Sequence, residues 1–279
     1  MRIAGEIITS RQNRLVIEVG KLTDRKARMV EERFRFDGIK LFREAVANGV
    51  CIEKLLLAES RSVQLLADLE SVKNAPALRD AVVYILSDDA FSKVSQEQAP
   101  EGILAVARFP SFHVRGEHSR EMLSDVAGKP QTRVLLLESV RDPGNIGTIL
   151  RSAAAFGVSC VVLSGDCADI YNPKTIRGAM GALFRMKIAV FEDITEAIEL
   201  LKTAGRRVLA AALDPDAVRL SKTLLCAEDC VVIGNEGHGL SSDAICACGQ
   251  SLYIPMEKGS ESLNAAIAAS VILWSMYGN

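Results

Sequence analysis

Continuous apolar runs recur along the second half of the chain, and a polar or glycine-rich loop follows each of them. The clearest runs are Val134–Leu137, Cys160–Leu163 and Val231–Ile233. A strand that is buried on both faces of a parallel sheet has this pattern. Helical patterns lie between the runs, at 148–156, 173–182 and 194–202, and further strands are expected at 186–190 and 208–213. The alternation predicts a parallel α/β domain over residues 132–279.

The first half of the chain shows the same alternation on a smaller scale. Strands are expected at 52–58, 81–86 and 102–109, with helices at 62–73 and 87–94. A further helix is expected over 29–48, around a break at Phe36-Asp37-Gly38. These elements predict a smaller α/β domain over residues 1–110. Residues 111–131 are polar, with prolines near both ends, and predict a linker that holds a short helix at 117–127.

Residues 230–274 contain two strand–loop–helix units in succession. A glycine-rich loop at 234–239 follows the first strand, and a polar loop at 257–262 follows the second. The helix expected over 263–277 is apolar nearly all round, which indicates burial. Ser262 and Asn264 stand at its start, where each is either a simple helix cap or a ligand-binding group. Two such loops at strand ends in one segment favour a ligand site.

The composition is that of an ordinary globular protein of two domains. The chain has 279 residues, 49% hydrophobic and 24% charged, with a net charge of −2, so no overall basic field indicates nucleic acid. Residues 11–43 are locally different, with ten lysines or arginines against five acids. This segment fits either contact with phosphates or a solvated helix face.

Targeting and metal signals are weak. The N-terminus has no apolar signal region, and the apolar helix at 263–277 is shorter than the roughly 18–20 residues of a membrane span. Seven scattered cysteines without a C-x-x-C pair indicate reduced thiols and a cytoplasmic location. Cys246-Ala247-Cys248 has the form of a metal-site fragment, but no histidine stands at ligand spacing, so no metal is expected.

The common cofactor motifs are absent from the sequence. It has no G-x-G-x-x-G after a strand, no P-loop and no G-x-S-x-G, which weighs against dinucleotide oxidoreductases, P-loop NTPases and α/β hydrolases. Three loops at strand ends remain, at 138–147, 234–240 and 257–262. Arg151 and Glu236 add charge to them. The alternatives are that Arg151 is an exposed helix arginine and Glu236 an acidic residue near a helix start.

Three segments resemble the signature motifs of the SpoU/TrmH RNA ribose 2′-O-methyltransferases of the SPOUT superfamily, in the same order. They are 138–157 (ESVRDPGNIGTILRSAAAFG), 233–240 (IGNEGHGL) and 254–268, which runs from Ile254-Pro255-Met256 through SESLNAAIA. The first half resembles the L30e-like RNA-binding domain of this family more loosely, at Phe36-Asp37-Gly38 and 99–105. The family usually has Glu where Asp37 stands, and Gln or another residue in place of Glu101.

The resemblance implies a SPOUT domain with a deep trefoil knot, S-adenosylmethionine as the cofactor, and a homodimer whose active site combines residues of both subunits. It implies a structured RNA as the partner, with rRNA favoured over tRNA. The residues that would hold the cofactor are Gly234, Asn235, Ile254, Met256 and Leu263. The residues that would serve the reaction are Arg151, Asn145, Glu236, Ser262 and Asn264.

Two other functions fit the sequence. One is a catalytically inactive RNA-binding module of the same fold, against which the presence of all five candidate reaction residues weighs. The other is a small-molecule α/β enzyme that binds a nucleotide with the same loops and needs no RNA.

Overall fold

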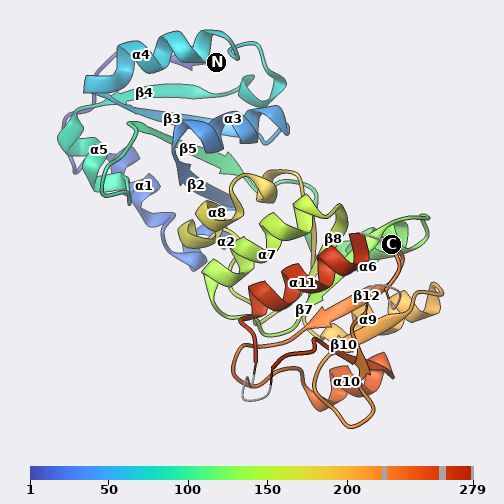
Figure 1. Ribbon diagram of the computed structural model, residues 1–279. Coiled ribbons are helices and arrows are strands. Elements are labelled where there is room, and N and C mark those ends of the chain that lie inside the picture. The colour runs from blue at the N-terminus through green and yellow to red at the C-terminus, as the bar shows by residue number, and fades with distance from the viewer. Residues whose placement is uncertain (222–224, 258–261, 278–279) are drawn as a thin grey trace. The chain divides into compact units, whose positions relative to one another are not determined.

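The apolar runs of the second half form a parallel sheet, as expected. The computed structural model describes residues 1–221, 225–257 and 262–277, and Figure 1 shows its elements. The chain divides into two units. The first contains Met1–Pro110 and Tyr171–Ile176, and the second contains Ser111–Ile170 and Arg177–Asn279.

Within the described residues, the sheet of the second unit has eight strands in the order β11-β13-β10-β12-β7-β8-β9-β6, and every neighbouring pair is parallel. Its strands are β6 (His113–Arg115), β7 (Arg133–Leu137), β8 (Val158–Ser164), β9 (Lys187–Phe191), β10 (Val208–Ala211), β11 (Val218–Arg219), β12 (Cys230–Ile233) and β13 (Ser251–Tyr253). Its helices are α6 (Glu117–Ala127), α7 (Pro143–Ala155), α9 (Ile194–Thr203), α10 (Ser242–Cys248) and α11 (Ala265–Tyr277), while α8 (Pro173–Ala179) crosses the boundary between the units.

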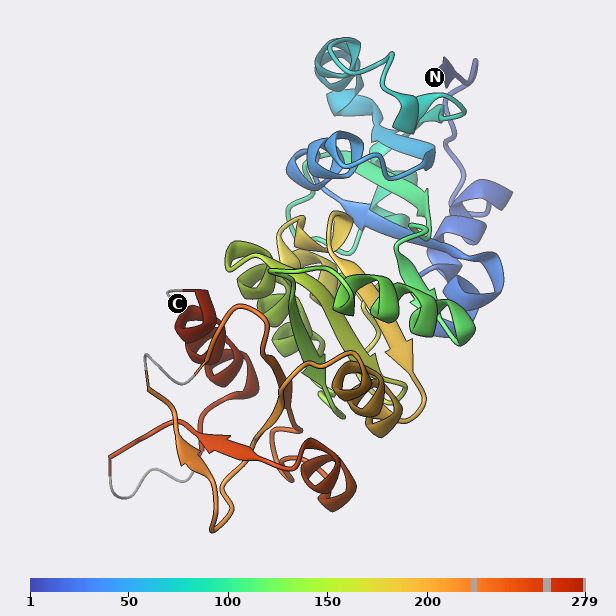
Figure 2. The same cartoon turned by 90° about the vertical axis from the view of Figure 1, so that its right-hand side faces the viewer.

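Alternate residues of the central strands face opposite sides of this sheet. Val134 and Leu136 of β7 belong to a core that includes side chains of α6, α9 and α10. Leu135 and Leu137 are also fully buried and point to the other side. There α7 and α11 pack side by side, and Figure 2 shows α11 on one side of the strands and α9 and α10 on the other. Burial on both faces explains the unbroken apolar runs.

Two expectations for the second unit differ from the structure. Residues 111–131 were expected to be a linker with a short helix at 117–127. The helix is present as α6, but β6 precedes it and pairs with β9 at the edge of the sheet. The segment before Thr148 was expected to be a loop, but α7 begins at Pro143. The Asp142 side chain accepts a hydrogen bond from the backbone N–H of Asn145, and proline fits the first helical position because it needs no N–H partner.

The first unit has a five-stranded sheet in the order β1-β4-β3-β5-β2. Its strands are β1 (Arg2–Ile3), β2 (Arg33–Asp37), β3 (Ile52–Ala58), β4 (Val82–Leu86) and β5 (Ile103–Arg108). Its helices are α1 (Arg14–Lys21), α2 (Arg25–Glu31), α3 (Ile39–Ala47), α4 (Glu59–Glu70) and α5 (Asp88–Val94). Side chains of α1 and α5 share a core with β3 and β5.

The prediction of a helix over 29–48 was wrong in its middle. Residues 33–37 form β2, which pairs antiparallel with β5, and Gly38 turns the chain into α3 with a φ of 100°. Phe34 and Phe36 are both buried in this strand. Pairing with the open edge of β5 outweighs the local helical pattern, because it satisfies the backbone and buries both rings.

Arg206 links the segments that lead into β7, β10 and β12. Its removal is expected to destabilise the second unit. This buried guanidinium donates hydrogen bonds to the carbonyl oxygens of Ala127, Lys129, Thr132 and Glu228. An Arg206→Met variant keeps the aliphatic bulk but leaves these acceptors without their donor. The free energy of unfolding in urea should fall by roughly 2–4 kcal/mol.

The exposed Arg219 serves as the control for this experiment. Arg219→Met removes the same charge from the same sheet and should change the free energy of unfolding by no more than about 0.5 kcal/mol. Equal effects of the two substitutions would contradict the role given to Arg206.

Candidate functional site

The carboxyl ends of β13, β10, β12 and β7 meet at one edge of the sheet, because neighbouring parallel strands run in the same direction. The segments after β10, β12 and β13, together with the first half of α11 and the residues before it, line a cavity of about 490 Å³. Glycine and alanine backbone, aliphatic side chains and a few polar groups line it. Such a cavity suits a ligand with flat apolar faces and a small number of polar edges.

The loop after β12 is a small closed hairpin. Asn235 and Gly239 exchange two backbone hydrogen bonds of 3.0 Å, and Gly239 has a φ of 70°. The Asn235 side-chain oxygen accepts hydrogen bonds from the N–H groups of Gly237 (2.8 Å) and His238 (3.2 Å). Gly234 lies so close to Gly239 that a Cβ atom on it would stand 2.4 Å from the Gly239 carbonyl carbon. The hairpin therefore depends on the missing side chain at 234.

The loop after β7 supports this hairpin from the neighbouring strand. The Asn235 side-chain amide donates to the carbonyl oxygen of Ser139 at 2.7 Å. The Glu138 carboxylate accepts hydrogen bonds from the N–H (2.8 Å) and the hydroxyl (2.7 Å) of Ser241, the N-cap of α10. The two loops are thus joined on both sides of the hairpin.

Asp166 holds Ser139 in an unusual backbone conformation, with a φ of 54°. The Ser139 and Ser164 hydroxyls each donate to the Asp166 carboxylate at 2.6 Å, and Arg141 donates at 3.1 Å. Burial by itself raises the pKa of Asp166, but these three hydrogen bonds outweigh burial and lower the pKa below its ordinary value. The stabilisation is therefore present above the ordinary carboxyl pKa, and it is lost as the pH falls through the lower pKa of the folded state.

A series of side-chain hydrogen bonds crosses the site from Asn264 through Asn145 to Glu236, and we call it the amide chain. The Asn264 oxygen accepts from the N–H groups of Ala266 (2.9 Å) and Ile267 (3.4 Å) at the start of α11. The Asn264 amide group donates to the Asn145 oxygen at 3.0 Å, and the Asn145 amide group donates to Glu236 Oε1 at 2.7 Å. Each amide is held in one orientation, so the chain presents the Glu236 carboxylate beside the cavity as a fixed acceptor.

The structure brings most of the candidate residues together. All five that were expected to hold a cofactor line the cavity, and two of the expected reaction residues join them: Gly234, Asn235, Ile254, Met256, Leu263, Glu236 and Ser262. Asn145 and Asn264 reach the site through the amide chain. Ser262 makes no hydrogen bond to any residue in the described ranges. Of the polar loop 257–262, residues 258–261 lie outside the described residues.

Arg151 is the exception, since it does not line the cavity of its own chain. It follows Asn145 by six residues on α7, which turns it about 120° around the helix axis and moves it roughly 9 Å along that axis. It is exposed, and no side chain in the described part of the chain bonds to it. The next residue, Ser152, faces α11, with its hydroxyl 2.8 Å from that of Ser270.

Ser139 and Asp166 were not expected from the sequence to support the site. Ser139 stands within the first candidate loop, but a serine gives no sign of a positive φ. Asp166 follows β8, on the far side of β7 from the cavity strands. Its position after a buried strand, at the same edge as the other loops, is the signal that could have indicated it.

No group of three or more His, Cys, Asp or Glu side chains that could hold a metal ion occurs among the described residues. In those same ranges, no helix combines the length and the apolar character needed to cross a membrane.

Two family models match the chain. The model for the SpoU rRNA Methylase family matches residues 132–274, and the model for the MRM3-like substrate binding domain matches residues 13–105. The first match covers every loop of the site described above. The chain belongs to the SpoU rRNA Methylase family.

Named relatives extend over nearly the whole chain. A 23S rRNA (guanosine(2553)-2′-O)-methyltransferase of Bacillus subtilis (strain 168) is 30% identical over 275 residues, 97% of this chain and 99% of the relative. A 23S rRNA (uridine(2479)-2′-O)-methyltransferase of Streptomyces viridochromogenes is 28% identical over 281 residues, 97% of this chain and 91% of the relative. The structure of an AdoMet-bound rRNA methyltransferase from Sinorhizobium meliloti is 26% identical, with a TM-score of 0.79 over 98% of this chain and 97% of that chain.

Substituting Gly234 should open the hairpin. A Cβ atom at this position meets the backbone of Gly239 and Leu240 at 2.4–2.5 Å, and backbone atoms cannot move aside cheaply. Gly234→Ala should lower the free energy of unfolding by roughly 2–4 kcal/mol, measured by urea denaturation.

Gly237→Ala is the matched control in the same loop, because its Cβ would meet only Asn235 Oδ1, at an ordinary 3.5 Å. It should change the free energy of unfolding by about 1 kcal/mol or less. A Gly234→Ala protein as stable as this control would show that the hairpin does not depend on the close approach.

Proposed function

We propose that this protein transfers a methyl group from S-adenosylmethionine to a ribose 2′-hydroxyl of RNA. The observation that carries the proposal is the cavity, which gathers all five residues expected to hold the cofactor and lies beside the amide chain that ends on Glu236. Membership of the SpoU rRNA Methylase family and the AdoMet-bound relative from Sinorhizobium meliloti support the choice of cofactor.

The lining of the cavity fits S-adenosylmethionine. Aliphatic side chains such as Ile254 and Ile272 offer apolar faces for a purine, and the backbone at Gly234 borders the same cavity. Met256 and Ala268 also line the cavity and offer apolar contacts for the carbon atoms around the sulfonium. When bound, the cofactor supplies an electrophilic methyl group on a positively charged sulfur. The ordered hairpin and the start of α11 would fix its position and exclude water.

The chain's own residues must align the acceptor oxygen and ease the loss of its proton. Arg151 would clamp the phosphate next to the acceptor ribose and polarise the 2′-hydroxyl with its fork of N–H donors. A guanidinium stays protonated, so a phosphate oxygen or a water molecule would accept the proton. Asn145, Glu236, Ser262 and Asn264 would shape the pocket around the sugar.

A second copy of the chain would supply Arg151 to the site. In its own chain this side chain is exposed and does not line the cavity, and the next residue, Ser152, contacts α11. That neighbouring helix carries exposed apolar side chains, Ile267 (54%), Trp274 (56%) and Tyr277 (57%). Ile267 and Trp274 lie two turns apart on one side of α11. An apolar surface of this kind fits a dimer interface, and two-fold packing would carry Arg151 to the partner's cavity.

The favoured substrate is rRNA rather than tRNA. Both named relatives act on 23S rRNA, one at a guanosine and the other at a uridine. Since their bases differ, the base is not inferred from them. The alternative of an inactive RNA-binding module gains no support, since the amide chain from Asn264 to Glu236 is complete.

Replacing Arg151 should abolish methyl transfer while cofactor binding remains. Wild-type protein incubated with S-adenosylmethionine carrying a labelled methyl group should label 23S rRNA on ribose oxygens. Arg151→Ala should lower kcat by about 10²–10⁴-fold, with a cofactor Kd, measured by calorimetry, within about twofold of wild type. Arg151→Lys keeps the positive charge but lacks the paired N–H donors of the guanidinium, so it should restore little of the methyltransferase activity. A wild-type kcat in Arg151→Ala would contradict the role of Arg151 in the reaction. Failure of the wild-type protein to methylate any RNA would contradict the proposed methyltransferase function.

Mixing two inactive variants tests whether Arg151 acts across subunits. When equal amounts of Arg151→Ala and Glu236→Ala chains re-form dimers at random, half of the dimers are heterodimers. If the arginine comes from the partner, each heterodimer contains one doubly damaged site and one intact site. Activity should then recover to about a quarter of wild type. If Arg151 serves its own chain, each site keeps one defect, and the mixture stays inactive.

A further inference from the structure

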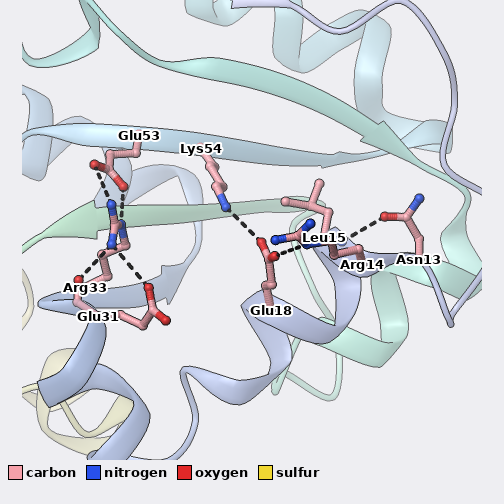
Figure 3. Close-up of polar contacts among 8 residues, drawn as sticks. All are labelled: Asn13, Arg14, Leu15, Glu18, Glu31, Arg33, Glu53 and Lys54. Atoms are coloured by element: carbon pink, nitrogen blue, oxygen red, sulfur yellow. Dashed lines mark hydrogen bonds and ion pairs between the residues drawn. The ribbon is translucent and has the colours of Figure 1, made fainter.

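The basic segment 11–43 separates into three groups in the structure. The first group is neutralised by carboxylates. Arg11 pairs with Asp89 (2.7 Å) and Arg14 with Glu18 (2.7 Å). Arg33 pairs with Glu53 and with Glu31, as Figure 3 shows. These three cations have their charge balanced within the first unit.

The second group is buried and structural. Arg28 is only 2% exposed and donates to the carbonyl oxygens of Leu22 (2.8 Å) and Thr23 (2.7 Å), in the short connection between α1 and α2. Arg35 is also buried and donates to the carbonyl oxygen of Val94 at the end of α5. Arg28 therefore fixes the angle at which α2 leaves α1.

The third group consists of five exposed cations that make no hydrogen bond or ion pair with any residue in the described ranges: Lys21, Arg25, Lys26, Lys40 and Arg43. Lys40 and Arg43 lie on α3, and the Glu101 carboxylate already accepts a 2.7 Å hydrogen bond from the Ile39 N–H at the start of that helix. An anion occupies the place where a phosphate would otherwise bind. The remaining three cations lie together where α1 ends and α2 begins.

We call this surface the α1–α2 corner and define it as Lys21, Arg25, Lys26, Met29 and Val30. On α2 the spacing of four residues places Met29 behind Arg25 and Val30 behind Lys26. Met29 is 36% exposed and Val30 is 75% exposed. The corner thus presents a row of cations bordered by a row of apolar side chains.

Helix stability does not account for this arrangement. Arg25 and Lys26 are the first two residues of α2, where the positive end of the helix dipole disfavours cations. Asp24 is the acid nearest in sequence, and its carboxylate accepts a hydrogen bond from the Ala27 N–H as the helix cap. A bound polyanion would relieve this concentration of charge.

We propose that the α1–α2 corner is a docking surface for the phosphate backbone of the RNA substrate. The three cations would contact successive phosphates, and Met29 and Val30 would pack against the sugars or an unstacked base. This inference rests on the proposed function, since it takes RNA as the substrate. A protein partner is the competing occupant. A surface of three cations that pair with no described residue complements a regular polyanion better than a mixed protein surface.

Two triple variants with the same change in net charge test the proposal. The corner variant is Lys21→Gln, Arg25→Gln, Lys26→Gln. The control is Arg11→Gln, Arg14→Gln, Lys54→Gln, whose cations pair with Asp89 or Glu18. The probe is an in vitro transcript of 23S rRNA without ribosomal proteins. Kd is measured by mobility shift between about 0.05 and 0.2 M salt.

The corner variant should bind the transcript roughly tenfold or more weakly than the control, with a salt slope smaller by about 2. The calorimetric Kd for S-adenosylmethionine should be unchanged in both variants, which separates this proposal from the function of the cavity. Equal transcript affinities and salt slopes in the two variants overturn the proposal. So does a corner variant that binds naked transcript normally but loses binding to ribosomal particles, because the occupant is then a protein.

Discussion

The side-chain amide of Asn145 is the interaction on which the candidate site depends. It joins Glu236, 91 residues away, to Asn264, 119 residues away, through hydrogen bonds of 2.7 and 3.0 Å. An amide has one donor end and one acceptor end, so its two partners fix its orientation. The amide chain starts at the first N–H groups of α11 and ends at the Glu236 carboxylate. The polar edge of the cavity is therefore oriented before any ligand arrives, which is what catalysis by positioning requires.

Asn264 also shows that a capping role and a functional role need not exclude each other. Its oxygen satisfies the first N–H groups of α11, and its amide group continues toward Asn145. The helix cap thus supplies the rigidity that the amide chain needs. Ser262, for which the same two interpretations were open, faces the cavity and does not cap the helix.

The sequence predicted the parallel sheet well because burial on both faces leaves an unmistakable apolar run. It failed at β2, where Phe34 and Phe36 sit in a charged context and become a strand only because β5 offers an open edge. The three motifs predicted which residues gather at the cavity. They did not predict that Arg151 lies outside it, since the rotation of a side chain around α7 depends on where the helix begins. The roles of Ser139 and Asp166 were not predicted, because they depend on backbone conformation and on strand order. The trefoil knot implied by the resemblance stays a prediction.

The position of β12 in the sheet has a consequence for folding during synthesis on the ribosome. β12 lies between β10 and β7, although β7 precedes it by nearly a hundred residues, and the side chain of Asn235 bonds to a carbonyl 96 residues earlier. While the ribosome makes that stretch, which takes about 5–20 s, one edge of β7 has no neighbouring strand. Until β12 is made, this edge of the apolar strand β7 stays unpaired in the nascent chain, so shielding by a chaperone would matter most in that interval.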